Sequence, residues 1–150
     1  MINIKNITKK YSNNDNDDFI IILKDISLEI KKSEIVTVYG NSGVGKSTLF
    51  SIISGMLKPD SGVIKIKKFD LNENNNLTIR RKYLGILFQD NNLLPEFSVK
   101  ENLILPMLIN NKSKENAISH ANYLLDLIQM NNYLNRYPKT LSKGESQRIS

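Results

Sequence analysis

The chain has 150 residues, a length typical of one domain, and carries a formal net charge of +6. It has no cysteine, which excludes a disulfide framework and a thiolate metal site. Its apolar runs are far shorter than the roughly 18 residues of a membrane span, and its N-terminus lacks the apolar core of a signal peptide, so we expect a cytosolic chain. The lysines are scattered among acidic residues without a stripe of aromatics, which argues against a nucleic-acid partner.

The N-terminal segment is predicted to form two antiparallel strands. Residues 2–7 alternate isoleucine with polar residues, the pattern of a half-buried strand. A polar loop follows at 13–18, and residues 19–30 form a second apolar run that alternates at Ile26, Leu28 and Ile30. We expect these two runs to pair, and residues 31–34 to turn the chain.

Residues 35–48, IVTVYGNSGVGKST, combine an apolar strand-like run, a glycine-rich loop and the start of a helix. Gly40, Gly45, Lys46 and Ser47 match every fixed position of the P-loop pattern in the strand–loop–helix order that the pattern requires. Glycines that accept positive φ let backbone N–H groups approach phosphate oxygens, and the helix N-terminus adds a partial positive charge. The stretch therefore predicts a phosphate cradle.

The side chains of this loop have distinct predicted tasks. Lys46 supplies a full positive charge for the β- and γ-phosphates, the Ser47 hydroxyl ligates Mg²⁺, and Thr48 binds the α-phosphate. ATP or GTP with Mg²⁺ is therefore implied, although a P-loop does not identify the reaction. The predicted phosphate-binding residues are Gly40, Asn41, Ser42, Gly43, Val44, Gly45, Lys46, Ser47 and Thr48.

Residues 49–88 are predicted to form one helix and two strands. Apolar residues at helical spacing indicate a helix that ends near Leu57, before Pro59. A turn at 59–62 leads to a short strand at 63–66, and residues 71–77 form an Asn-rich loop. Residues 83–88, YLGILF, are typical of a buried strand that ends at Gln89.

The remaining segment is predicted to be helical. Ser98 and Glu101 form a capping box that opens a helix, which Pro106 kinks or ends. A second helix at 114–130 places one apolar face toward the core, and His120, the only histidine, flanks that face as a surface or packing residue. The apolar face consists of Ala117, Ala121, Leu124, Leu125 and Ile128.

Residues 141–145, LSKGE, followed by Ser146-Gln147-Arg148, lie at the start of a predicted helix. Behind a P-loop, this segment resembles the signature LSGGQ or LSGGE of the ATP-binding subunit of ABC transporters, and the resemblance covers the whole chain in the family's order. The resemblance implies a homodimer in which the signature contacts the γ-phosphate held by the opposite subunit. Lys143 replaces the first glycine, which costs about 1 kcal/mol if that position requires positive φ. The implied contact residues are Ser142, Lys143, Gly144 and Glu145.

Two further residues resemble functional positions of the family. Gln89 resembles the Q-loop glutamine, which implies that it senses Mg²⁺ and the attacking water. Tyr11 resembles the A-loop aromatic, which implies that it stacks on adenine and favours ATP over GTP. The alternatives, a solvated loop glutamine and a strand-end aromatic that packs locally, remain open.

Residues 85–97, together with Glu101-Asn102 and Leu105-Pro106, look most like the lipoprotein-releasing and macrolide-export branch of the family. The resemblance implies a peripheral protein on the cytoplasmic face of the bacterial inner membrane. It also implies that transmembrane permease subunits dock after the Q-loop, although an apolar loop that closes the core is an alternative. The implied docking residues are Leu93, Leu94, Pro95, Glu96 and Phe97.

The implied fold is α/β: a P-loop NTPase (RecA-like) core with an antiparallel β flank and a helical subdomain, with the C-terminal part of the fold absent. We expect one incomplete domain over 1–150, with the flank and core at 1–90 and the helical subdomain at 91–150. The family's Walker B Asp and its following Glu lie beyond the signature helix, so this chain alone is expected to hydrolyse little or no ATP.

Two alternatives to the transport ATPase therefore stand. One is a truncated, non-hydrolytic nucleotide-binding remnant. The other is a soluble ATPase of the DNA-repair type, against which the short separation of Gln89 from Leu141 counts, because those proteins insert a long coiled coil.

Overall fold

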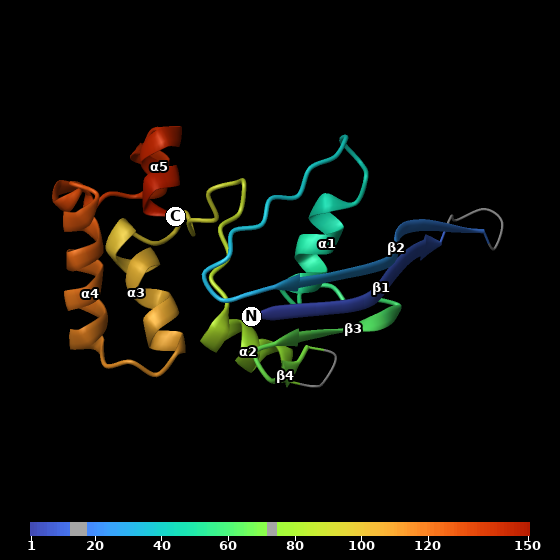
Figure 1. Ribbon diagram of the computed structural model, residues 1–150. Coiled ribbons are helices and arrows are strands. Elements are labelled where there is room, and N and C mark those ends of the chain that lie inside the picture. The colour runs from blue at the N-terminus through green and yellow to red at the C-terminus, as the bar shows by residue number, and fades with distance from the viewer. Residues whose placement is uncertain (13–17, 72–74) are drawn as a thin grey trace. The chain divides into compact units, whose positions relative to one another are not determined.

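The computed structural model describes residues 1–12, 18–71 and 75–150, and it divides into two compact units, residues 1–86 and 87–150 (Figure 1). Most of the predicted polar loop at 13–18 and the middle of the Asn-rich loop, residues 72–74, lie outside the described residues. No helix among the described residues is long and apolar enough to cross a membrane.

Unit 1 is built on an antiparallel sheet, as predicted. Among the described residues its strands are β1 (Ile2–Ser12), β2 (Phe19–Ile30), β3 (Ser61–Ile66) and β4 (Phe69–Asp70), in the order β2-β1-β3-β4 (Figure 1). The predicted pairing of the first two strands is confirmed, with Ile2 opposite Ile30 and Tyr11 opposite Ile20. β3 begins at Ser61, so the end of the predicted turn at 59–62 is already strand.

The central strand β1 approaches β3 very closely near an irregularity at Asn6. Asn6 has a φ of 53°, and the β1–β3 register shifts between Lys5 and Thr8. Gly62 has a φ of +94°, and a Cβ atom there would lie 2.5 Å from the carbonyl oxygens of both Lys5 and Asn6. Only glycine fits this crossing without strain, so the start of β3 lies directly against β1.

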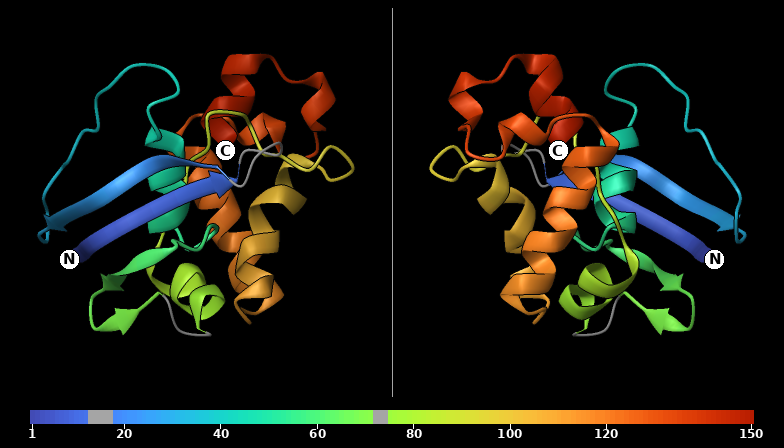
Figure 2. Two further views of the ribbon diagram at one scale, coloured as in Figure 1. Left: turned by 90° about the vertical axis from the view of Figure 1, so that its right-hand side faces the viewer. Right: turned by 90° about the vertical axis from the view of Figure 1, so that its left-hand side faces the viewer.

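The core of unit 1 lies between the sheet and two helices, α1 (Lys46–Ile53) and α2 (Asn76–Tyr83), which Figure 2 shows from two sides. The alternation of β1 buries Ile4 and Ile7, and the helical spacing of α1 buries Leu49 and Ile52. Buried residues from both elements form one cluster, which consists of Ile4, Ile7, Leu23, Leu49, Ile52, Ile64, Ile66, Leu71 and Ile79. Helix α2 was not predicted.

Two predicted strands are wrong. Residues 35–39 and 83–88 pair with no strand among the residues that the structure describes, and Tyr83 instead ends α2. The side chains of Ile35 and Leu87 are 94% and 71% exposed. A buried strand needs hydrogen-bonded neighbours and covered faces, and the described sheet gives these apolar runs neither.

The predicted end of the P-loop helix is also wrong. Helix α1 ends at Ile53 rather than near Leu57. Gly55 adopts a φ of +71°, and the N–H groups of Met56 and Leu57 both donate to the Ser51 carbonyl at 2.9 and 3.0 Å. The sequence carried this signal, because a glycine in the left-handed region is a common helix terminator.

Unit 2 contains three α-helices among its described residues, α3 (Val99–Ile109), α4 (Lys114–Leu127) and α5 (Lys143–Ile149), and the 3₁₀ turns η1 (Asn131–Tyr133) and η2 (Pro138–Thr140). The predicted capping box is confirmed: Ser98 Oγ accepts from the Glu101 N–H at 3.3 Å, and Glu101 Oε2 accepts from the Ser98 N–H at 2.7 Å. Pro106 lies inside α3 and does not end it.

Helix α4 packs its predicted apolar face into the unit, with Ala117, Ala121 and Leu125 buried. It ends at Leu127 rather than Met130, because Gln129 adopts a φ of 56° and the Met130 N–H closes back onto the Leu125 carbonyl at 2.8 Å. His120 is exposed beside Tyr123, as expected of a surface residue.

Candidate functional site

The P-loop has the backbone shape that its glycines predict. Gly43 and Gly45 have φ values of +81° and +100°, and Gly45 is the N-cap of α1. A Cβ atom on Gly45 would lie 2.8 Å from Ile22 Cγ2 and 3.1 Å from the Ile22 carbonyl oxygen. Strand β2 therefore packs directly against the loop, and this contact requires a glycine at position 45.

Lys46 lies across this loop. Its Nζ donates to the carbonyl oxygens of Gly40 and Asn41, both at 2.7 Å. Helix α1, which is described throughout, has no side-chain cap and no acidic residue in its first turn. The N–H groups of that turn are left without intrahelical partners, so the loop offers an ammonium group and backbone donors to an anion.

The two hydroxyl residues that follow Lys46 lie in the same helical turn. Ser47 is exposed and Thr48 is half-buried. No group of three or more His, Asp or Glu side chains that could hold a metal ion occurs among the described residues. A serine hydroxyl directly after Lys46 fits a metal ion that is bound mainly by phosphate oxygens.

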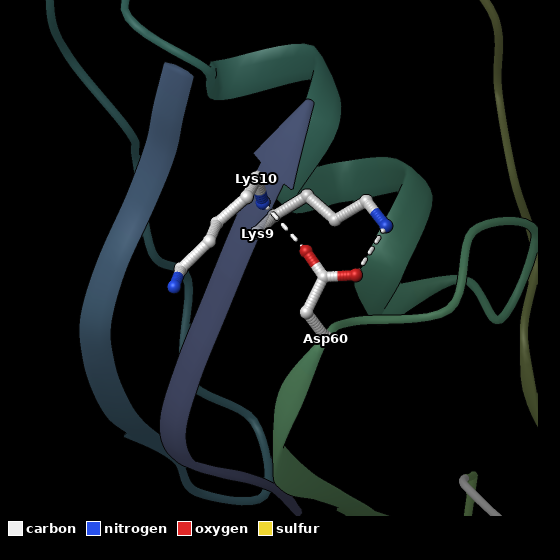
Figure 3. A network of polar contacts seen from close by, with 3 residues as sticks. All are labelled: Lys9, Lys10 and Asp60. Atoms are coloured by element: carbon white, nitrogen blue, oxygen red, sulfur yellow. Dashed lines mark hydrogen bonds and ion pairs between the residues drawn. The ribbon is translucent and has the colours of Figure 1, made fainter. Parts of the chain in front are cut away.

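Tyr11 lies near the end of β1, and the residue is 44% exposed. Lys9 Nζ lies 5.6 Å from the centroid of the Tyr11 ring. The same ammonium group is 3.0 Å from Asp60 Oδ1, and Asp60 Oδ2 accepts from the Lys10 N–H at 2.6 Å (Figure 3). The Lys10 hydrogen bond, together with Lys9, holds the pKa of Asp60 below its ordinary value.

Asp60 was missed by the sequence reasoning, which placed it only in a turn. A Pro-Asp-Ser-Gly segment signals a turn, but nothing in its pattern indicates a contact with residues about fifty positions earlier.

The signature segment forms a second capping box. Ser142 Oγ accepts from the Glu145 N–H at 3.3 Å, and Glu145 Oε2 accepts from the Ser142 N–H at 2.7 Å. Tyr133 Oη donates to Glu145 Oε1 at 2.7 Å. The Tyr133 hydrogen bond, followed by those of Ser142, lowers the pKa of Glu145 to about 2, and the same carboxylate raises the pKa of Tyr133.

Lys143 is the first residue of α5 and is not among the residues with positive φ. The backbone penalty considered for a lysine at this position therefore does not arise. Gly144 is also unconstrained, because a Cβ atom there would meet nothing within 4 Å.

The segment after Gln89 is shaped by Asn102. Asn102 Oδ1 accepts from the Leu94 N–H at 2.7 Å, and its Nδ2 donates to the carbonyl oxygens of Leu94 and Phe97 at 3.1 and 3.0 Å. Leu93 is half-buried against the cluster of Val99, whereas Leu94 and Phe97 are 41% and 39% exposed. Gln89 is exposed.

The candidate residues thus form two groups, each within its own unit. Unit 1 contains the P-loop and Tyr11. Unit 2 holds Gln89, the segment 93–97 and the signature helix.

Comparison with known proteins agrees with these motifs. The family model described as ABC transporter matches residues 23–150. The chain is 38% identical to the lipoprotein-releasing system ATP-binding protein LolD of Francisella tularensis subsp. holarctica, an alignment that covers all of this chain and 66% of that protein. It is 37% identical to LolD of Cytophaga hutchinsonii, over 86% of this chain and 60% of that protein.

Solved structures give the same result. A dimeric post-hydrolysis structure of the ATP-binding cassette MJ0796, bound to ADP and Pi, matches with a TM-score of 0.88 at 35% identity. A second dimeric structure of this bacterial ABC transporter cassette matches equally well. Each match covers 99% of this chain and 66% of the cassette. The chain thus spans about two thirds of the length of these relatives.

Proposed function

The chain belongs to the ABC transporter family, and from that premise we propose that it is the ATP-binding part of a transport ATPase. The observation that carries the proposal is the P-loop: positive-φ glycines at its turns, an uncapped helix behind it and the Lys46 ammonium at its carbonyls. This combination favours a polyphosphate ligand over a neutral one, because the loop presents a cation and the unpaired N–H groups of a helix N-terminus and carries no acidic side chain.

The nucleotide in this proposal is ATP. Residues 40–48 would hold its phosphates, and Tyr11 would stack on its adenine, since the ring is partly exposed and belongs to the same unit as the P-loop. Ser47 would ligate Mg²⁺, which neutralises charge on the phosphates when it is bound. Lys46 would orient the β- and γ-phosphates through its ammonium group.

The proposed assembly is a homodimer beneath transmembrane permease subunits. In it, Ser142, Lys143, Gly144 and Glu145 would meet the ATP held by the second copy, and the segment Leu93–Phe97 would receive the permease. The dimeric MJ0796 cassettes support the homodimer, and the exposed Leu94 and Phe97 side chains support the docking segment. The LolD relatives favour lipoprotein release at the bacterial inner membrane as the process that ATP drives.

We expect the 150-residue chain to bind ATP and to hydrolyse little of it. Phosphoryl transfer relies on carboxylates that hold the metal and position water. Glu145 is the one carboxylate among the residues assigned here to ATP, and hydrogen bonds from Tyr133 and Ser142 already occupy both of its oxygens. The proposal for this chain therefore centres on binding.

The test is the affinity for ATP with Mg²⁺, measured by titration calorimetry on the wild type, Lys46→Ala and Lys112→Ala. Removing the Lys46 ammonium from the phosphates should weaken binding at least about tenfold, the effect of losing a charge-assisted contact. Lys112→Ala, which removes the same charge from an exposed loop, should leave the affinity unchanged. Equal ATP affinity in Lys46→Ala and wild type would contradict the P-loop assignment. Phosphate release on the same samples should stay near background.

A further inference from the structure

We propose that Asp60 is a positioning residue that fixes the adenine-stacking Tyr11 relative to the phosphate loop. The inference rests on the proposed function, in which ATP binds the P-loop and its base stacks on Tyr11. Asp60 touches neither group. It acts through the end of β1, the strand that carries Tyr11.

Residue 60 is hydrogen-bonded to three successive residues of β1. Its carboxylate accepts from the Lys10 N–H at 2.6 Å and from Lys9 Nζ at 3.0 Å, and its own N–H donates to the Thr8 carbonyl at 3.0 Å. Figure 3 shows the two carboxylate oxygens turned to different partners, one to the backbone and one to the ammonium group. The carboxylate therefore restrains the β1 backbone at Lys10 and the side chain of Lys9.

The end of β1 needs such a contact because there it is paired with β2 on one side but no longer with β3 on the other. Pairing with β3 ends at Thr8 opposite Ser61, whereas pairing with β2 continues to Ser12. Beyond Thr8 the N–H of Lys10 has no β3 residue opposite it, and Asp60 Oδ2 takes the place of the missing carbonyl. A charged acceptor makes this bond stronger than the neutral ladder bond that it replaces.

Lys9 extends the restraint to the aromatic ring. Its side chain is only 13% exposed, and its ammonium group lies 3.0 Å from Asp60 Oδ1, the anion that balances its charge. The same ammonium lies 5.6 Å from the Tyr11 ring centroid, within range of a cation–π contact. Removing the carboxylate would leave this cation without its anion and free it to leave the ring.

Asp60 is also tied to the phosphate end of the site. The segment before it leaves α1 through a tight turn, in which Met56 and Leu57 donate to Ser51 and Ser54 Oγ donates to the same carbonyl at 2.9 Å. Helix α1 carries Lys46 at its other end. A short segment of chain therefore links the P-loop helix to Asp60, and hydrogen bonds link Asp60 to the end of β1 that carries Tyr11. All of these residues belong to unit 1.

The experiment compares two ligands on the full chain: ATP and inorganic tripolyphosphate, each with Mg²⁺. Tripolyphosphate probes the phosphate loop alone, whereas ATP probes the loop and the base platform together. The variants are Tyr11→Ala, Asp60→Ala, Asp60→Asn and the control Glu29→Gln, which removes a carboxylate from the opposite end of the β1–β2 pair, where Glu29 faces Asn3. Affinities are measured by competition against a fluorescent nucleotide, and circular dichroism checks that each variant is folded.

Tyr11→Ala should lose about tenfold in affinity for ATP, which corresponds to the free energy of one base–aromatic stack. Its affinity for tripolyphosphate should be unchanged. Asp60→Ala should lose about threefold or more in affinity for ATP, because part of the stacking on Tyr11 is lost, and should keep its affinity for tripolyphosphate. Asp60→Asn should lose less affinity for ATP, since an amide oxygen can still accept from the Lys10 N–H. Glu29→Gln should match the wild type for both ligands.

The outcomes separate the two claims. If the wild type binds neither ligand, the proposed function fails. If Tyr11→Ala loses ATP selectively while Asp60→Ala retains the wild-type ratio of the two affinities, the proposed function stands and the inference about Asp60 is overturned. If Asp60→Ala loses both ligands equally, its role is structural support of the whole site, which also overturns the inference.

Discussion

Glu145 shows how a single residue can fix the start of a helix. Its carboxylate accepts from the Tyr133 hydroxyl on one oxygen and from the Ser142 N–H on the other, while its own N–H donates to Ser142 Oγ. Tyr133 is itself restrained, because the Arg136 guanidinium lies 4.4 Å from its ring centroid. The turn that opens the signature helix is therefore held from both sides by an ionised glutamate.

This arrangement predicts a pH dependence. The pKa of Glu145 is about 2 in the folded chain against an ordinary 4.5, because the Tyr133 hydrogen bond and those of Ser142 favour the carboxylate. A depressed pKa adds stability that is fully present above pH 4.5 and is lost as the pH falls toward 2. Tyr133→Phe removes the largest of these causes and should raise the Glu145 pKa toward 4.5, as followed by carboxyl-carbon NMR titration.

Two controls make this result specific. Glu101 forms the corresponding capping box of α3 with Ser98, so Tyr133→Phe should leave its lowered pKa unchanged, which excludes a general change in helix electrostatics. In urea unfolding at pH 7 and pH 3, Glu145→Gln should show a smaller pH dependence than the wild type. An unchanged Glu145 pKa in Tyr133→Phe would contradict the hydrogen bond.

At the scale of elements, the segment before α3 depends on a side chain from inside that helix. The Asn102 side chain accepts from the Leu94 N–H through Oδ1 and donates to the Leu94 carbonyl through Nδ2. Its Nδ2 also donates to the carbonyls of Phe97 and Ser98. Asn102→Asp keeps the acceptor but loses every donor and places a charge against three carbonyl oxygens. It should destabilise unit 2 by about 1–3 kcal/mol, the cost of leaving such groups unpaired, as measured by urea unfolding.

The same variant should loosen the segment locally. The amide hydrogens of Leu94 and Phe97 should exchange faster, since the first bonds Asn102 directly and the second bonds the Leu94 carbonyl at 3.2 Å. Asn122→Asp, on the exposed side of α4, makes the same chemical change and should have no such effect. Unaltered exchange at Leu94 would show that Asn102 does not shape the segment.

The elements also show which parts of the fold the sequence could predict. Elements with local signals were predicted well: the alternation of β1, the capping box of α3 and the P-loop glycines each act within a few residues. The predicted strands at 35–39 and 83–88 failed because strand formation depends on partners that composition does not reveal. Helix α2 was missed because it follows an Asn-rich stretch and buries only Ile79, so it lacks a strong apolar period.

The candidate site follows the same rule. Lys46, the P-loop glycines and the signature serine could be predicted, since each belongs to a contiguous motif. Asp60, Tyr133 and Asn102 could not, because their roles arise from contacts with other segments, with Asp60 fifty positions from Lys10. The Ser142-x-x-Glu145 spacing, by contrast, is a capping-box pattern that the sequence already carried.

At the scale of the whole molecule, the described chain exposes large apolar side chains at the two runs that failed to form strands. Ile35 and Tyr39 are 94% and 87% exposed in unit 1, and Leu87 is 71% exposed in unit 2. Exposed apolar runs of high β-propensity are templates for strand pairing between molecules. The net charge of +6 makes the chains repel one another, but physiological salt screens most of this repulsion. We therefore expect the 150-residue chain to self-associate through these runs.

The test is the monomer fraction by size-exclusion chromatography with light scattering. Ile35→Thr and Leu87→Thr keep β-propensity but remove apolar surface, so each should raise the monomer fraction at a given concentration, and the double variant should raise it further. Phe19→Thr is the matched control, because it removes a 65% exposed aromatic from a strand that already pairs with β1. If Phe19→Thr raised the monomer fraction as much as the double variant, association would follow total exposed apolar area rather than unpaired backbone. If no variant changed it, the unpaired runs would not be the contact surface.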